Sequence, residues 1–338
     1  MTTKGNETER NAVGLRVGAP AKVNLFFEIL FKRDDGFHEI QTVATPIDLC
    51  DELEFKLRDE KTGAEIEKTS IIECVDEAGK PVPGVPLDDR NLIIRAARAF
   101  DEAFGTPTPV SIRVVKRIPS QAGLGGGSSD AAATLAALNE LRGRPFSNER
   151  LREIGGRLGS DVPLFLLDGA SVGRSRGEIV EPFDLPKIWL VVLKPTEGLS
   201  TPAVFRQYVA LAPTAKRSLD DFCAAVATLK EASGEKTAIC GDVAAAVGAS
   251  LFNRLEEVAS TIWDGVARYR ALLSATRDVL GVQMSGSGTA FFAIYPNEAA
   301  ANGAAEALRR ECGDGETVAV ARTLGTTFRF QTLESTAE

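Results

Sequence analysis

A run of seven residues, Gly123-Leu124-Gly125-Gly126-Gly127-Ser128-Ser129, places four glycines directly before two hydroxyl side chains. It lies between an alternating apolar segment at 110–118, which predicts a strand, and an apolar series over 131–141, which predicts a helix. Glycines let a backbone curl closely around an anion, and the free N–H groups and dipole of a helix N-terminus stabilise negative charge. The run therefore predicts a phosphate-binding loop at the mouth of a helix.

Two widespread phosphate motifs do not describe this glycine loop. A P-loop requires a lysine that is missing here, and a dinucleotide fingerprint requires a third glycine where Ser128 stands. A tight strand-to-helix connection that binds nothing is the alternative, and the density of glycines argues against it. We expect Ser128, Ser129 or Asp130 to cap the helix and Gly143 to end it.

The rest of the sequence predicts strands and helices in mixed order. Apolar groups between 13 and 55 predict a β-hairpin whose turn is marked by Asp35-Gly36, and the charged stretch 56–89 predicts an excursion from the core. Further elements are expected in this order: a helix at 91–104, a helix from 147 to 158, strands at 170–172 and 188–193, several helices over 201–273, and a strand, loop, strand, helix, strand series from 282 to 323. This order favours mixed α and β structure in two lobes, with polar tails at 1–12 and 326–338.

The net charge and the positions of the cysteines argue against several classes of function. The formal net charge of -8 offers nucleic acid no general attraction, so local groups must hold any phosphate. The five cysteines are widely scattered, which favours reduced thiols over a disulfide framework or a zinc site. The polar N-terminus lacks an apolar targeting segment, and no later stretch is long and apolar enough to cross a bilayer. We therefore expect a cytoplasmic protein that binds neither nucleic acid nor membrane.

Three segments together resemble the motifs of the GHMP kinase superfamily. Residues 19–25 (Ala-Pro-Ala-Lys-Val-Asn-Leu) resemble its first motif, the loop at 119–132 its second, and residues 283–289 (Gln-Met-Ser-Gly-Ser-Gly-Thr) its third. The resemblance spans about Val17 to Ala321. It implies an α+β fold with two lobes, an N-terminal lobe at 13–185 similar to the second domain of ribosomal protein S5 and a ferredoxin-like C-terminal lobe at 186–325.

Four further segments resemble one branch of this superfamily, which phosphorylates an alcohol carrying cytidine diphosphate. They are Asp35-Gly-Phe-His-Glu39, the glycine loop with its extra glycine, Leu158-Gly-Ser-Asp-Val-Pro-Leu-Phe165, and Thr201-Pro-Ala-Val-Phe205. The resemblance implies ATP-dependent phosphorylation of the 2-hydroxyl of 4-diphosphocytidyl-2-C-methyl-D-erythritol, in the non-mevalonate route to isoprenoid precursors. ATP and Mg²⁺ are the implied cofactors, and the protein is expected to be a monomer or a homodimer.

The resemblance assigns the catalytic roles to Lys22 and Asp161. Asp161 would accept the proton of the substrate hydroxyl, and Lys22 would stabilise that carboxylate and the transferring phosphoryl group. Without the resemblance, a solvent-exposed lysine and a helix-flanking aspartate would be the ordinary explanations. Pro163 is expected to keep Val162 extended, so that a stiff segment presents Asp161.

The remaining site residues also follow from the resemblance. ATP would bind to the loop residues Pro119, Gly123, Leu124, Gly125, Gly126, Gly127, Ser128 and Ser129. The hydroxyl of Ser129 would in addition bind Mg²⁺, directly or through water. The substrate would bind to Asn24, Phe37, His38, Thr201, Phe205, Ser285, Gly286, Ser287 and Gly288. Phe37 and Phe205 would stack on the cytosine, while His38 would hydrogen-bond its polar edge.

Some residues depart from the pattern of this branch. Phe37 stands where a tyrosine is usual, Asp130 where an asparagine is usual, and Ser175 near a usual glycine, while the 56–89 stretch is longer. His38 is the only histidine in the chain, which argues against a metal site built on histidine pairs. Two other functions remain open at this point: a GHMP kinase for homoserine or a mevalonate-type alcohol, and a catalytically silent nucleotide-binding protein with the same fold.

Overall fold

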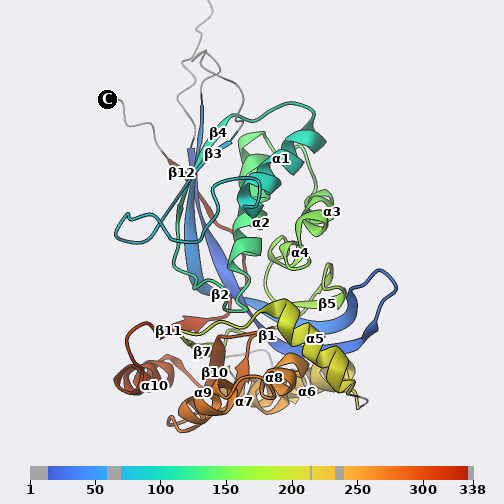
Figure 1. The fold of residues 1–338 in the computed structure, drawn as a ribbon, viewed down its shortest axis with the longest axis vertical. Helices are drawn as coiled ribbons and strands as arrows, with labels where there is room; N and C mark the ends of the chain where they lie inside the picture. The colour runs from blue at the N-terminus through green and yellow to red at the C-terminus, as the bar shows by residue number, and fades with distance from the viewer. Residues whose placement is uncertain (1–13, 59–69, 214, 233–239, 334–338) are drawn as a thin grey trace, which may run out of the picture.

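The computed structural model describes residues 14–58, 70–213, 215–232 and 240–333, which form two β-sheets with helices packed on them (Figure 1). The strands are β1 Gly14–Lys32, β2 His38–Leu57, β3 Ser70–Val75, β4 Val110–Val115, β5 Ser171–Ser175, β6 Ile179–Pro182, β7 Trp189–Lys194, β8 Phe252–Asn253, β9 Gly281–Met284, β10 Phe291–Tyr295, β11 Thr317–Arg322 and β12 Phe330–Leu333. The helices are α1 Leu92–Phe104, α2 Gly126–Leu141, α3 Asn148–Leu158, α4 Val162–Phe165, α5 Thr201–Leu211, α6 Leu219–Ala232, α7 Cys240–Ser250, α8 Arg254–Ala259, α9 Gly265–Ser274 and α10 Glu298–Glu311.

The larger sheet is built on the hairpin of β1 and β2. The predicted turn is present, because Gly36 adopts a positive φ of 88° and its N–H donates to the carbonyl oxygen of Arg33. Along the main path the strand order is β12-β1-β2-β4-β3, and β5, β6 and β8 join from the side. Both hairpin strands are long and bend at register shifts, so β1 carries its residues from one end of the molecule to the junction with the second sheet.

Helices α1 to α4 cover one face of the larger sheet. Their apolar side chains, such as Phe100 of α1 and Leu135 of α2, share one buried cluster with Leu53 and Phe55 of β2. The helices begin at recognisable caps, because the side chains of Asn91 and Ser147 accept backbone hydrogen bonds at α1 and α3. This packing fixes α2 against the sheet and thereby fixes the glycine loop at its N-terminus.

The smaller sheet has the order β11-β7-β10-β9 and is covered on both faces. Helices α9 and α10 pack on one face, where Tyr269 and Ala301 meet Phe291. On the other face α6 and α7 share a buried cluster with β1, and there Val192 and Val23 belong to the same apolar core. Because this cluster contains residues of both sheets, the two halves of the protein pack against each other through apolar contact.

Three expectations about the fold are wrong in part. Residues 326–338 were expected to be a tail, yet β12 pairs antiparallel with β1, because alternating apolar residues such as Phe330 pack on the main core. The 56–89 stretch was expected to leave the core, yet β3 pairs in parallel with β4. Val162 is helical rather than extended, since proline is tolerated in the first helical turn, where a backbone N–H has no helical partner. The expected tail at 1–12 lies outside the described residues.

The proposed boundary between lobes at residue 185 falls just before β7, the first strand of the smaller sheet. Two short strands from beyond that boundary, β8 and β12, nevertheless pair with β1 in the larger sheet. Of the described helices, none has the length and apolar character needed to span a membrane.

Candidate active site

Residues 119–122 lead into the glycine loop, and α2 begins within the loop, at Gly126. Gly123 and Gly125 have positive φ values of 73° and 71°, which favour glycine over any residue with a side chain. Gly123 also lies so close to the 285–289 segment that a Cβ atom there would come within 2.1 Å of the carbonyl oxygen of Ser285. The loop can therefore adopt this shape only because these two positions lack side chains. At its end lie the first N–H groups of α2, which have no partner within the helix.

Hydrogen bonds join this loop to both other motifs. The Lys22 N–H donates to the carbonyl oxygen of Leu124 at 2.9 Å, and the Ala290 N–H donates to that of Ala122 at 2.9 Å. The Ser285 hydroxyl donates to the carbonyl oxygen of Gly123 at 3.0 Å. The structure thus brings together three segments that are far apart in the sequence, as the resemblance predicted.

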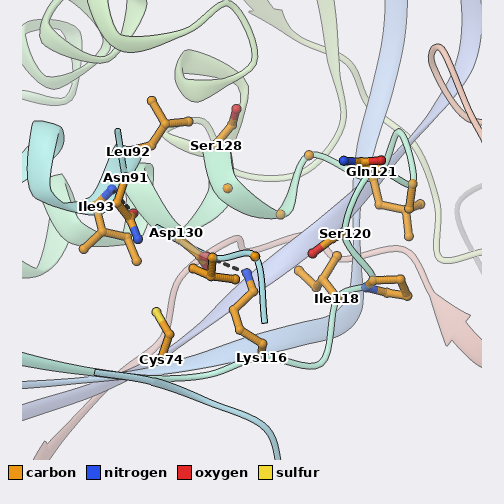
Figure 2. A pocket seen from close by; sticks show the side chains of 18 of the residues that line it. Cys74, Asn91, Leu92, Ile93, Lys116, Ile118, Ser120, Gln121, Ser128 and Asp130 are labelled. Carbon is orange, nitrogen blue, oxygen red and sulfur yellow. Dashed lines mark hydrogen bonds and ion pairs between the residues drawn. The ribbon is translucent and has the colours of Figure 1, made fainter. Parts of the chain in front are cut away.

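Two cavities lie on either side of the loop and meet at it. The first has a volume of about 400 Å³ and is shown in Figure 2; the second has a volume of about 1270 Å³. Residues of the loop and the start of α2 line both cavities, namely Gln121, Gly123, Gly125 and Ser128. A ligand in one cavity can therefore reach a ligand in the other across the glycine loop.

Lys22 and Asp161 lie in the second cavity, next to the glycine loop that both cavities share. Lys22 Nζ is 3.7 Å from Asp161 Oδ2, and both residues line the second cavity. Lys22 is buried, whereas 44% of the Asp161 side chain is exposed. Lys22 Nζ also donates to Asn24 Oδ1 at 2.6 Å, and Asn24 in turn donates to Thr42 Oγ1 at 2.9 Å. The ammonium group is thereby fixed beside a carboxylate that a ligand can approach.

The far end of the second cavity is aromatic. The rings of His38 and Phe205 lie 5.0 Å apart between centroids, and Tyr208 meets His38 edge-on at 5.7 Å. The guanidinium of Arg176 lies 4.8 Å from the centre of the exposed Phe37 ring. His38 Nε2 is buried without a hydrogen-bond partner, and burial lowers the pKa of His38, with a smaller contribution from the charge of Lys32. This end offers ring faces to a ligand, whereas the unpaired Nε2 atom lies buried behind them.

Comparison with known proteins identifies the family. The chain matches the family models for the GHMP kinases N terminal domain over residues 91–169 and the GHMP kinases C terminal domain over residues 241–314. It is also 39% identical over 288 residues to the 4-diphosphocytidyl-2-C-methyl-D-erythritol kinase of Polaromonas sp., which covers 83% of this chain and 84% of the relative. The chain belongs to the GHMP kinases, within the 4-diphosphocytidyl-2-C-methyl-D-erythritol kinase family.

Other relatives carry the same kinase name or share the fold. The enzyme of that name from Exiguobacterium sibiricum is 38% identical over 91% of this chain and 98% of its own length. A crystal structure of 4-(cytidine 5'-diphospho)-2C-methyl-D-erythritol kinase matches with a TM-score of 0.69 and 32% identity, covering 90% of this chain and 98% of that one. Homoserine kinase from Cytophaga hutchinsonii has a TM-score of 0.68 at 18% identity, covering 97% of this chain and 100% of that one, so it shares the fold. The protein is thus an ATP-dependent kinase with the two-lobed fold that the sequence predicted.

Most of the residues predicted from the sequence line one of this kinase's cavities. Of the predicted ATP-binding residues, those that line the first cavity are Pro119, Gly123, Leu124, Gly125, Gly126, Gly127 and Ser128. The predicted substrate-binding residues that line the second cavity are Phe37, His38, Thr201, Phe205, Gly286, Ser287 and Gly288. Two others, Asn24 and Ser285, are buried behind the surface and contact Lys22 and Gly123 instead.

Ser129 does not fit the role expected for it. Its side chain is fully buried, its Oγ atom has no hydrogen-bond partner, and it lines neither cavity. The helix starts at Gly126, three residues earlier than Ser129, so its periodicity turns this hydroxyl toward the core and Ser128 toward the cavities. In this position the Ser129 hydroxyl is not placed to bind ATP or Mg²⁺, contrary to the expectation.

The expected cap of α2 is also corrected. Gly125 occupies the cap position, and no side chain caps the helix there. Asp130 instead lies within α2, where its Oδ2 atom accepts a hydrogen bond from Lys116 Nζ at 2.7 Å. The same ammonium group pairs with the carboxylate of Asp51, which belongs to β2. A lone lysine in a strand-to-loop segment gives no local signal, so the sequence could not reveal this cluster.

Several cations and one buried supporting residue of the site were not predicted from the sequence. Lys32, Arg176 and Arg206 line the second cavity and add positive charge to it. Asn253 Nδ2 donates to the carbonyl oxygens of Met284 and Gly286, at 2.8 Å in each case, and so shapes the third motif. Arg206 directly follows the 201–205 segment and Lys32 lies just before the 35–39 segment, so proximity to those segments is the signal that could have found them. Asn253 has no such signal, because it contacts the third motif only through the tertiary fold.

Proposed function

We propose that this kinase transfers the γ-phosphoryl group of ATP to the 2-hydroxyl of 4-diphosphocytidyl-2-C-methyl-D-erythritol, a step of the non-mevalonate route to isoprenoid precursors. The names of its relatives support this substrate. The observation that carries the proposal is the Lys22–Asp161 pair, because it lines the second cavity next to the glycine loop that both cavities share.

The first cavity suits the nucleoside part of ATP. Apolar side chains such as Val85, Leu92 and Ile118 line it, and it opens onto the amides of Gly126 and Gly127. A purine is flat and largely apolar on its faces, whereas its phosphates require N–H donors and the positive end of a helix dipole. ATP bound in this way extends its terminal phosphate along the loop toward Ser128 and the second cavity.

The second cavity suits a cytidine diphosphate derivative. The ring of Phe37 offers a face for stacking, and Phe205 and His38 border the same space. Lys32 and Arg206 line the same cavity and can attract a diphosphate. With the base at this aromatic end, the alcohol part of the substrate reaches toward Asp161.

The chemistry follows from the fixed position of Lys22. Asp161 orients the substrate hydroxyl and accepts its proton, and the exposed fraction of this carboxylate leaves room for that contact. Lys22 lies beside this carboxylate and attracts the equatorial oxygens of the phosphoryl group as charge moves onto the leaving oxygen. Thr201 and Ser287, whose hydroxyl oxygens lie 2.6 Å apart, line the same space and can contact the substrate.

The side chains fit a magnesium ion that is carried by ATP rather than a resident metal ion. Among the described residues there is no group of three or more histidine, cysteine, aspartate or glutamate side chains that could hold a metal. Magnesium readily binds through phosphate oxygens and water, and when bound to ATP it neutralises phosphate charge during transfer.

The proposal also covers the location of the enzyme, its oligomeric state and the bounds of its two lobes. We propose a cytoplasmic enzyme, acting as a monomer or a homodimer, with an N-terminal lobe at 13–185 and a C-terminal lobe at 186–325. The net charge of -8 supports the absence of nucleic acid among its partners.

An assay of ADP formation tests the function. The purified chain, ATP, Mg²⁺ and 4-diphosphocytidyl-2-C-methyl-D-erythritol should give ADP and a phosphorylated product, identified by mass and by ³¹P NMR. Homoserine and mevalonate serve as matched acceptors in parallel reactions. Turnover of either one in place of the cytidine substrate would move the chain to another GHMP activity, and binding of ATP without any turnover would favour a silent binding protein.

A further inference from the structure

Three charged side chains form a buried cluster beside the glycine loop, and the catalytic scheme uses none of them. Lys116 Nζ pairs with the carboxylates of both Asp51 and Asp130. Asp51 Oδ1 also accepts hydrogen bonds from the backbone N–H groups of Arg117 at 2.6 Å and Ile118 at 2.8 Å. The cluster therefore connects β2, the segment just before the loop, and the helix just after it.

The two carboxylates of this cluster are not equivalent. Asp51 has three donors, two from the backbone and one from Lys116. Asp130 has one donor, Lys116, and its other oxygen, Oδ1, is buried without a partner. Only 3% of Asp130 is exposed, yet the residue lines the first cavity, where Figure 2 shows it beside Lys116. The less satisfied carboxylate is thus the one that borders the proposed nucleotide site.

The charges of the cluster do not cancel. Two carboxylates and one ammonium leave one net negative charge in a site that is largely closed to water. The Cys74 thiol of β3 also interacts with Asp130, and it is uncharged because its pKa is raised to about 11, mainly by burial. Arg90 is a further charged residue that lines the same cavity as Asp130. In such surroundings electrostatic interactions are screened less than at an exposed surface.

We propose that Asp130 sets the affinity for the nucleotide, because its charge opposes the attraction between the N-terminus of α2 and the phosphates of ATP and ADP. This inference rests on the proposed binding of ATP at the glycine loop. Asp130 is the fifth residue of α2, so its carboxylate lies little more than one helical turn from the amides of Gly126 and Gly127. A neutral side chain of the same shape at this position would leave the attraction unopposed.

The geometry also makes this effect depend on pH. Burial, followed by repulsion from Asp51, raises the pKa of Asp130 to about 7, while Lys116 acts in the opposite direction. A smaller fraction of this carboxylate is therefore ionised at pH 6 than at pH 8.5. Its opposition to the phosphates should accordingly be weaker at pH 6 than at pH 8.5.

Binding measurements on the full chain test this inference. Asp130→Asn removes the charge and keeps the shape, and Glu140→Gln removes one charge from the other end of the same helix, where Glu140 pairs with Arg144 at the surface. Dissociation constants for ATP in excess magnesium, and for uncharged adenosine by competition, are measured by calorimetry at pH 6 and pH 8.5. At pH 8.5, Asp130→Asn should bind ATP about three- to tenfold more tightly than the unaltered chain.

The other arms separate charge from packing. Affinity for adenosine should not change, Glu140→Gln should match the unaltered chain, and the gain from Asp130→Asn should be smaller at pH 6 than at pH 8.5. The unaltered chain alone should bind ATP less tightly at pH 8.5 than at pH 6, which tests the inference even if the variant does not fold. Equal ATP affinity of both proteins at pH 8.5, or an equal gain for adenosine, would overturn it. Failure of the unaltered chain to bind ATP at all would overturn the proposed function as well.

Discussion

Lys22 Nζ lies 3.7 Å from Asp161 Oδ2, although the first residue belongs to β1 and the second precedes the short helix α4. Three constraints fix the lysine: its amide donates to Leu124, its ammonium group donates to Asn24, and its aliphatic part packs close to Gly125. The aspartate has more freedom and more exposure. A fixed cation beside an accessible carboxylate is the arrangement expected if the carboxylate contacts a ligand.

Replacement of Asp161 tests the chemical step. Asp161→Asn should lower kcat by about 100-fold or more while the affinity for the cytidine substrate is kept, because the amide can orient a hydroxyl but does not accept its proton. Steady-state kinetics with both substrates measures this. Asp264→Asn, an exposed position whose side chain makes no cap hydrogen bond, is the matched control and should behave as the unaltered chain. Near-normal turnover by Asp161→Asn would remove the assigned role.

Two glycines of the same loop should respond differently to alanine. At Gly123 the positive φ strains an alanine, and its Cβ would meet the carbonyl oxygen of Ser285 at 2.1 Å, so the loop must move. At Gly127 the nearest atom would be Leu92 Cδ1 at 3.8 Å, and alanine favours a helix by about 1 kcal/mol over glycine. Urea denaturation should show Gly123→Ala destabilised by about 2 kcal/mol or more, and Gly127→Ala unchanged or more stable. A similar loss in both would contradict the close docking of Gly123.

Removal of the Phe37 ring should weaken binding of the cytidine substrate. Stacking on a base contributes about 1–3 kcal/mol, so Phe37→Ala should raise KM for that substrate about tenfold and leave KM for ATP unchanged. Phe31→Ala is the matched control, because Phe31 is similarly exposed, at 57% against 51%, on the same hairpin but lines neither cavity. Equal effects of Phe37→Ala on both KM values would remove the stacking role.

The single histidine provides a direct titration experiment. In a tag-free chain, the ring protons of His38 should titrate by NMR with a pKa below the ordinary histidine value, because burial disfavours the charged ring. The unfolded chain then binds this proton more readily than the folded one, so stability should fall as the pH falls below the ordinary histidine pKa. His38→Gln should remove this component. A raised pKa, or an unaltered pH dependence of stability in the variant, would contradict it.

Local patterns were sufficient for much of the fold. The Asp35-Gly36 turn, the helix after Ser147 and the strand series that begins at 282 were predicted correctly, because turn residues, caps and apolar periodicity act over a few neighbouring positions. Predictions failed where distant pairing decides the outcome. In the sequence, the residues around Phe330 look like a polar chain end, and they form a strand because β1 pairs with them. In the same way, β3 lies within the charged 56–89 stretch and forms a strand because β4 pairs with it.

The features of the candidate site also fall into two groups, those that could be predicted from the sequence and those that depend on the fold. The sequence by itself predicted the glycine loop, since backbone shape is a local property of the chain. Lys22 and Asp161 were singled out by the resemblance of the motifs around them, because nothing local distinguishes them from exposed charges. Only the tertiary structure decided which hydroxyl faces the cavities, Ser128 rather than Ser129, because that depends on where α2 begins. It alone placed Asp130 against Lys116 and Asp51, because a buried charge takes its partner from whatever the packed elements bring within reach, and sequence separation sets no limit on that choice.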